Sequence, residues 1–172
     1  MMKMMILGII FVCCSLFGFF VDADERKRLK ELEEFIYLFE LLKREIDYQL
    51  TPLVAASRTV ASFGKGQVKQ VFLDFATFLE EQEGETILKM WEMALEKNKV
   101  LFHLKEEDYC LLETFGSCCG YLDKSMQTRN LEMILEKLGY AKKQGEEKYE
   151  KCSKLNRSLG MLIGGALVIF LI

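Results

Sequence analysis

The chain has 172 residues, of which 51% are hydrophobic and 28% are charged, and its formal net charge is −3. This length allows one compact domain of ordinary size, and the mildly acidic balance gives no support to a nucleic-acid-binding surface. Lys3 is the only charged residue outside residues 22–158. The sequence therefore predicts a water-soluble middle domain with an apolar segment at each end.

Residues 4–21 form an uncharged run near the amino terminus. A helix needs roughly 20 apolar residues to cross a bilayer, with a lower limit near 17, so this run just reaches. A secretory signal peptide is the rival interpretation, with residues 21–23 as the cleavage site. The apolar core of a signal peptide has only about 7–15 residues, and two acids flank this site. We therefore expect an uncleaved membrane helix over residues 1–23.

The middle domain, residues 24–156, has helical periodicity throughout and no alternating apolar–polar run. Asp24 and Glu25 suit a helix start, because acids are favoured in the first turn. Thr51 and Pro52 mark the first break, since Thr can cap a helix and Pro suits its first position. Helices are expected over residues 24–50, 52–63, 67–81, 86–98 and 105–120, and from 124 into the carboxyl-terminal tail. The predicted fold is all-α: a compact bundle of about six helices flanked by amino- and carboxyl-terminal membrane helices.

The first of these helices carries an apolar stripe that Leu38 and Leu41 widen beyond one face. Burial of more than one face inside the bundle is the simpler explanation of that width, and a groove for a partner is the sharper one. Trp91 is interpreted as an anchor of the core.

The carboxyl-terminal tail, residues 159–172, is the second uncharged segment. Its helix would be about 21 Å long against a hydrocarbon core of about 30 Å, and a start before Arg157, with that side chain reaching to the interface, supplies the missing length. We expect a membrane helix over residues 157–172, with a half-inserted tail as the alternative. Gly160 and Gly164 have the spacing that lets two membrane helices touch closely, or they reflect only the frequency of glycine in membrane helices.

Basic residues cluster on the domain side of both apolar segments. They are Arg26, Lys27, Arg28 and Lys30 at one end, and Lys142, Lys143, Lys148, Lys151, Lys154 and Arg157 at the other. Because basic flanks stay in the cytosol, the middle domain is predicted to lie on the cytosolic side. Cysteines kept reduced there agree with this prediction. Contact with anionic lipid is the simpler role for the same basic residues.

We find no pattern of residues that would form a catalytic, cofactor or metal site. His103 is the only histidine and has no Cys-x-x-Cys motif near it, so the spacing of metal ligands is missing. Cys118 and Cys119 are adjacent, which suits neither a redox motif nor a zinc knuckle. Residues 64–66, Gly-Lys-Gly, lack the spacing of a phosphate loop and are interpreted as a turn. We predict that the protein is not an enzyme and has neither a cofactor nor a small-molecule substrate.

Five short motifs follow one another along the chain. They are residues 45–53 (EIDYQLTPL), 91–95 (WEMAL), 111–120 (LLETFGSCCG), 148–151 (KYEK) and 158–160 (SLG). In this order and spacing the chain resembles the stage III sporulation protein AB family of endospore-forming bacteria. Two residues more than the expected spacing lie between Lys151 and Ser158, and the pair of cysteines is not a mark of that family.

The resemblance implies a domain similar to the F-type platform domain of type II secretion systems. It also implies a place in the channel between mother cell and forespore, as a membrane-anchored structural adaptor in the mother-cell membrane around the forespore. The implied partners are a secretion-type ATPase, other stage III sporulation membrane proteins and the lipid bilayer. The residues that we expect to bind the partners are Glu45, Asp47, Tyr48, Pro52, Glu80, Glu81 and Glu83.

Two alternative functions remain open from the sequence. One is a redox sensor that uses Cys118 and Cys119. The other is a general membrane scaffold that only oligomerises. The sequence does not identify the surface that binds the ATPase, and it does not give the oligomeric state.

Overall fold

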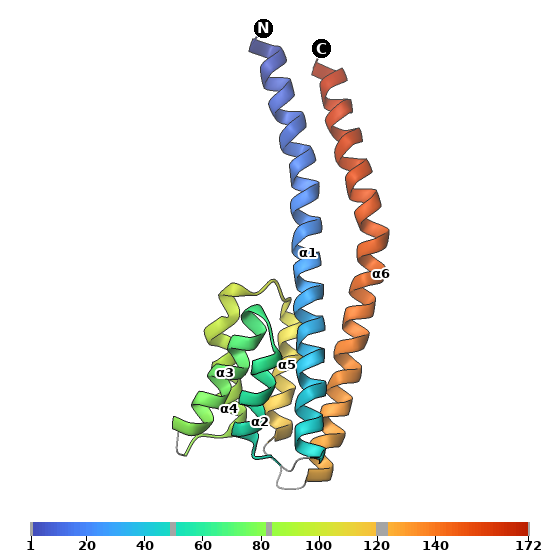
Figure 1. The fold of residues 1–172 in the computed structure, drawn as a ribbon. Helices are drawn as coiled ribbons and strands as arrows, with labels where there is room; N and C mark the ends of the chain where they lie inside the picture. Colours follow the sequence, from blue (N-terminus) through green and yellow to red (C-terminus); the bar gives the residue numbers. More distant parts are fainter. Residues whose placement is uncertain (1, 49–50, 82–83, 120–123, 172) are drawn as a thin grey trace. The chain divides into compact units, whose positions relative to one another are not determined.

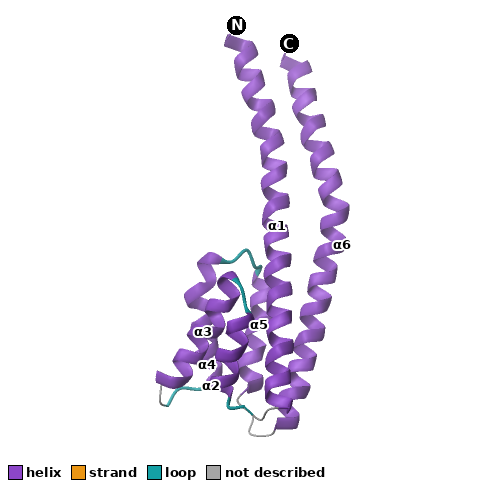
Figure 2. Cartoon of the chain, in the orientation of Figure 1, coloured by secondary structure: helices purple, strands orange, loops and turns teal. Residues whose placement is uncertain are grey.

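The computed structural model covers residues 1–172. The backbone is described for residues 2–48, 51–81, 84–119 and 124–171, and the side chains for 23–47, 51–81, 84–117, 119 and 126–151. Within these residues the chain forms helices and no strand (Figures 1 and 2). The elements are α1 (Met2–Tyr48), α2 (Leu53–Phe63), α3 (Gly66–Glu81), α4 (Ile87–Asn98), the 3-10 turn η1 (Lys99–Leu101), α5 (Glu106–Cys119) and α6 (Lys124–Leu171). The prediction of an all-α fold is confirmed.

The bounds of the shorter helices agree with the predicted ones to within one residue at each end. Helix α6 runs from Lys124 into the carboxyl-terminal tail without a break, as predicted. The helix start predicted at Asp24 is wrong, because α1 runs unbroken from Met2 to Tyr48. Acids stabilise a helix start where the chain before them ends the helix, and no proline precedes Asp24 to do so.

The side chain of Thr51 does not cap α2, which corrects a second prediction. Pro52 occupies the cap position with an extended backbone, φ −55° and ψ 143°, and no side chain caps the helix there. The hydroxyl of Thr51 instead donates a hydrogen bond to Oε2 of Glu45, at 3.4 Å. Proline still begins the helix, since its carbonyl oxygen accepts the bond from the amide of Ala56.

Two compact units make up the chain, and α1 and α6 each contribute to both. One unit holds residues 30–142, and the other holds residues 1–29 and 143–172. Where side chains are described, no helix is both long and apolar enough to cross a membrane. The membrane helices predicted over residues 1–23 and 157–172, with Gly160 and Gly164, lie outside those side chains except for Ala23.

An aromatic cluster forms the centre of the unit of residues 30–142. Its fully buried rings are Phe35, Phe39, Phe72, Phe75, Trp91 and Phe115. The ring centroid of Trp91 lies 4.6 Å from that of Phe115 and 5.1 Å from that of Phe75, both edge to face. Its Nε1 donates a hydrogen bond to the carbonyl oxygen of Leu112 at 2.7 Å, so the one polar atom of the ring is satisfied. The prediction that Trp91 anchors the core is confirmed.

Helix α1 buries more than one face in this unit. Leu32, Phe35, Leu38, Phe39 and Leu42 are all fully buried, and Leu41 is half-buried. Burial inside the bundle therefore accounts for the width of the apolar stripe. The remaining face of α1 carries polar residues and Tyr37, and it lines the groove described below.

Candidate functional site

The motif of residues 45–53 lies where α1 ends and α2 begins. Asp47 accepts a hydrogen bond on Oδ1 from the hydroxyl of Thr128 in α6, and Glu45 accepts the bond from Thr51. Ile46 between them is buried, while Pro52 is exposed. The acids of this motif thus bind within the chain and hold the end of α1 against its neighbours. The side chain of Tyr48 lies outside the described residues.

The second predicted partner segment, residues 80–85, follows the end of α3. Both oxygens of Glu80 accept hydrogen bonds from Arg58 of α2, at 2.9 Å from Nε and 2.5 Å from the terminal nitrogen. The hydrogen bond from Arg58 is the main cause that lowers the pKa of Glu80. Glu81 is exposed and makes no hydrogen bond or ion pair with another described residue. Glu83 lies outside the described residues.

The structure places both predicted segments at one end of the unit of residues 30–142. The carboxyl ends of α1 and α3 lie there, together with the amino ends of α2 and α4 (Figure 1). No described hydrogen bond or ion pair joins the acids of the two segments. The two segments therefore share an end of the bundle without forming one described cluster.

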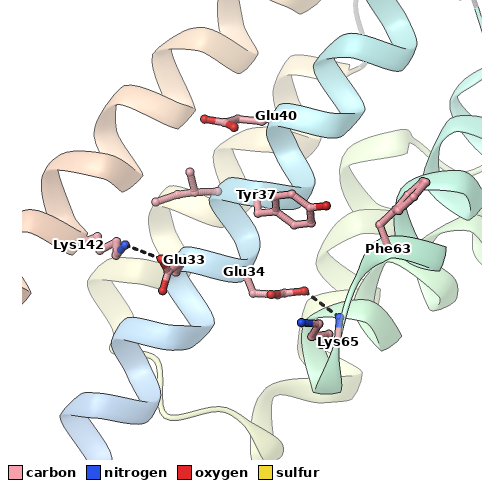
Figure 3. A pocket seen from close by; sticks show the side chains of 8 residues that line it. Glu33, Glu34, Tyr37, Glu40, Phe63, Lys65 and Lys142 are labelled. Atoms are coloured by element: carbon pink, nitrogen blue, oxygen red, sulfur yellow. Dashed lines mark hydrogen bonds and ion pairs between the residues drawn. The ribbon is translucent and has the colours of Figure 1, made fainter.

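A groove along α1, which we did not predict, is the main concave feature of the described residues. It has a volume of about 410 Å³ (Figure 3). Its lining residues come from α1, the end of α2, the turn after it, and α6. They are Glu33, Glu34, Ile36, Tyr37, Glu40, Phe63, Lys65 and Lys142.

Two polar contacts define the sides of this groove. The ammonium of Lys142 lies 3.1 Å from Oε1 of Glu33, and the backbone amide of Lys65 donates a hydrogen bond to Oε1 of Glu34 at 2.8 Å (Figure 3). These contacts join α6 and the α2–α3 turn to the same stretch of α1. The signal for the groove in the sequence was Tyr37, an aromatic residue on the polar face of α1.

Between those sides the groove presents two aromatic rings and a carboxylate to solvent. Tyr37 is 43% exposed and Phe63 is 56% exposed. The phenol of Tyr37 and the carboxylate of Glu40 make no hydrogen bond or ion pair with any described residue. Exposed rings beside an unpaired acid suit the docking of an amphipathic segment, because they offer apolar contact and charge together.

His103 and the described cysteines belong to the packing of the fold. Nδ1 of His103 lies 2.9 Å from Oε1 of Glu31, and its backbone amide donates to Oε2 of the same carboxylate at 2.8 Å. Cys119 is buried at 4% exposure, and the side chain of Cys118 lies outside the described residues. Among the described side chains, no group of three or more His, Cys, Asp or Glu residues could hold a metal ion.

Asp74 of α3 is a buried carboxylate to which the sequence gave no clue. Its oxygens accept hydrogen bonds from Asn98 at 2.8 Å, Lys97 at 2.9 Å and Gln70 at 3.2 Å. Burial alone raises the pKa of Asp74, but these donors and the charge of Lys97 outweigh it, and the pKa is lowered. The arrangement ties α3 to α4 and satisfies a buried acid, as a structural network does.

Known proteins similar to this chain point to one family. The family model described as stage III sporulation protein AB matches residues 3–172. The chain belongs to the stage III sporulation protein AB family. Its resemblance to that family, carried by the five motifs, is confirmed.

Two relatives extend this result. The chain is 27% identical to stage III sporulation protein AB of Bacillus subtilis (strain 168), over 99% of each chain. A solved structure of stage III sporulation protein AB (SpoIIIAB) matches with a TM-score of 0.67 and 25% identity, over 72% of this chain and 96% of the solved one. The relatives are named as sporulation proteins, and neither name states a reaction. The helical fold is thus one that the stage III sporulation protein AB family shares.

Proposed function

We propose that the chain is a membrane-anchored structural adaptor that works in sporulation, in the channel between mother cell and forespore. The observation that supports the proposal most is the family match over residues 3–172, which covers both apolar ends as well as the helical unit. In this proposal the helical unit links a secretion-type ATPase to membrane subunits of the stage III assembly. The adaptor acts through docking surfaces.

The proposed anchors are the uncharged ends, over residues 1–23 and 157–172. Helices α1 and α6 extend through these ends, and an apolar helix of about 20 residues is long enough to cross a bilayer. The basic residues that follow and precede the two ends favour a cytosolic position for the helical unit, in the mother-cell membrane around the forespore. A reporter fused to Ile172 that is active only in the cytosol would contradict this orientation.

Deletion of the gene tests the role in sporulation. We expect the spore-forming host to arrest after engulfment and to form few heat-resistant spores, and an intact copy of the gene to restore them. A copy that lacks residues 1–23 should accumulate without restoring spores, because the adaptor would no longer be held at the membrane. Normal spore counts after deletion would refute the proposal.

Glu81 offers a sharper test of the link to the ATPase, since this acid is exposed and bound to no described residue. We expect the charge reversal Glu81→Lys to reduce co-purification of the ATPase roughly tenfold, as loss of an interface charge pair does. Glu92→Lys on α4, another exposed acid, is the matched control and should leave co-purification unchanged. Equal recovery of the ATPase with both variants would exclude Glu81 from the contact.

A further inference from the structure

One exposed face of α1 carries a regular pattern of charges around an aromatic ring. Its residues are Lys30, Glu33, Tyr37, Glu40 and Arg44, and all are exposed. Their alternating spacing of three and four residues puts them on one face of the helix. The order along this face is basic, acidic, aromatic, acidic, basic. The pattern reads the same in both directions.

The groups at the middle of this face have few partners inside the chain. The phenol of Tyr37, the carboxylate of Glu40 and the guanidinium of Arg44 make no hydrogen bond or ion pair with any described residue. Glu33 pairs with Lys142, yet its side chain remains 65% exposed. These groups therefore hold interaction capacity that the fold of the described residues does not use.

The groove gives this face its apolar contacts. Phe63 stands at the end of α2 beside Tyr37, and both rings are open to solvent (Figure 3). Ile36 contributes a further apolar lining residue. A helix lying along α1 would place residues at i, i+3 or i+4, and i+7 against this lining.

Charge complementarity defines what such a helix must carry. Its basic residues would lie seven positions apart to reach Glu33 and Glu40, and an apolar residue between them would contact Tyr37 and Phe63. An arginine suits the position beside Glu40, because its guanidinium can pair with the carboxylate and stack on the ring of Tyr37. A strongly acidic helix would meet Glu33 and Glu40 as like charges.

We propose that the groove along α1 is the docking site for a basic amphipathic helix of a partner protein. The occupant has two basic residues seven positions apart with an apolar residue between them. Because the charge pattern of α1 is symmetric, the direction of the helix is not restricted by charge. This surface is separate from the residues at the far end of α1 and at Glu81, so its test is independent of the proposed ATPase contact.

The test uses the full chain in detergent micelles and two synthetic peptides as probes. The first is a helical peptide with arginines seven positions apart and a leucine between them, and the second has glutamates in place of the arginines. We expect wild-type protein to bind the arginine peptide in a salt-sensitive manner, measured by fluorescence anisotropy, and to bind the glutamate peptide at least tenfold more weakly.

The decisive variant is Glu40→Arg. It should weaken binding of the arginine peptide roughly tenfold and strengthen binding of the glutamate peptide, because the central charge pair is exchanged. Since Glu40 has no described partner, the fold should be unaffected, which circular dichroism checks. Phe63→Ser should weaken binding of both peptides by removing an exposed ring.

The control is Glu92→Arg on α4, which makes the same change of charge outside the groove. Equal weakening by Glu40→Arg and Glu92→Arg would show non-specific attraction and refute the proposal. A Glu40→Arg protein that gains no affinity for the glutamate peptide would also refute it. Sedimentation that detects self-association sensitive to Glu40→Arg would assign the groove to a second copy of the chain instead.

Discussion

At the scale of single residues, Asp74 illustrates how a buried charge is tolerated. Its side chain is 9% exposed, and three donors on α3 and α4 satisfy its oxygens. An unpaired carboxylate in this position would be costly, because burial disfavours the charged form. The donors reverse that effect, so the pKa is lowered and the charged form stabilises the folded state.

The substitution Asp74→Ala should lower the free energy of unfolding by about 2 kcal/mol, since it leaves the amide of Asn98 without its acceptor. Lys97→Ala should cost less, because the Lys97 side chain is 59% exposed. Urea denaturation measures both changes. Two equal losses would contradict the primary role of the buried acceptor.

The lowered pKa also predicts a dependence on pH. Above the ordinary value of 3.8 the contribution of Asp74 is fully present, and it is lost as the pH falls below 3.8 through the lower folded-state pKa. We therefore expect Asp74→Asn to be less sensitive than wild type to acid below that value. Unfolding free energies measured against pH test this expectation, and identical acid profiles would refute it.

Tyr109 gives the opposite sign at high pH. Burial is the first cause that raises its pKa, to about 12, and the negative charges of Glu31, Glu106, Glu96 and Asp108 add to it. The unfolded chain would lose this proton near pH 10, so stability should fall between pH 10 and about 12. Tyr109→Phe should reduce that fall, and ultraviolet absorbance of the phenolate should show one late-titrating tyrosine fewer.

At the scale of helices, the contact of α4 with α5 depends on a close approach at Gly116. A side-chain carbon built there would lie 3.0 Å from the Cα of Leu88 and 3.1 Å from the Cβ of Trp91. Neither atom is the flexible end of a side chain, so the two helices would have to separate. The family motif of residues 111–120 thus has a packing explanation at this glycine.

Gly116→Ala should lower the free energy of unfolding by about 1–2 kcal/mol, because the overlap outweighs the better helix propensity of alanine. Gly139→Ala in α6 is the matched control, since a side-chain carbon there meets nothing within 4 Å. It should raise stability by about 0.5–1 kcal/mol. Thermal unfolding of both variants measures the difference, and changes of the same sign would be inconsistent with the proposed contact.

At the scale of the whole chain, the buried aromatic cluster lies entirely within the unit of residues 30–142. A fragment of residues 24–156 should therefore unfold in one cooperative transition, with Trp91 fluorescence and circular dichroism reporting the same midpoint. Separate midpoints would mean that the apolar ends are needed for a single folded state. This prediction concerns stability and is independent of the proposed membrane anchoring.

The sequence by itself determined which residues form helices, because periodic apolar residues and the break at Pro52 are local signals. It also determined that both ends lack charge and that Trp91 belongs to the core. Only the tertiary structure decided that Asp74 meets Lys97 and Asn98, that Arg58 pairs with Glu80, and that a groove opens beside Tyr37. Periodicity fixes the apolar face of a helix but not its neighbours, and these contacts join residues on different helices.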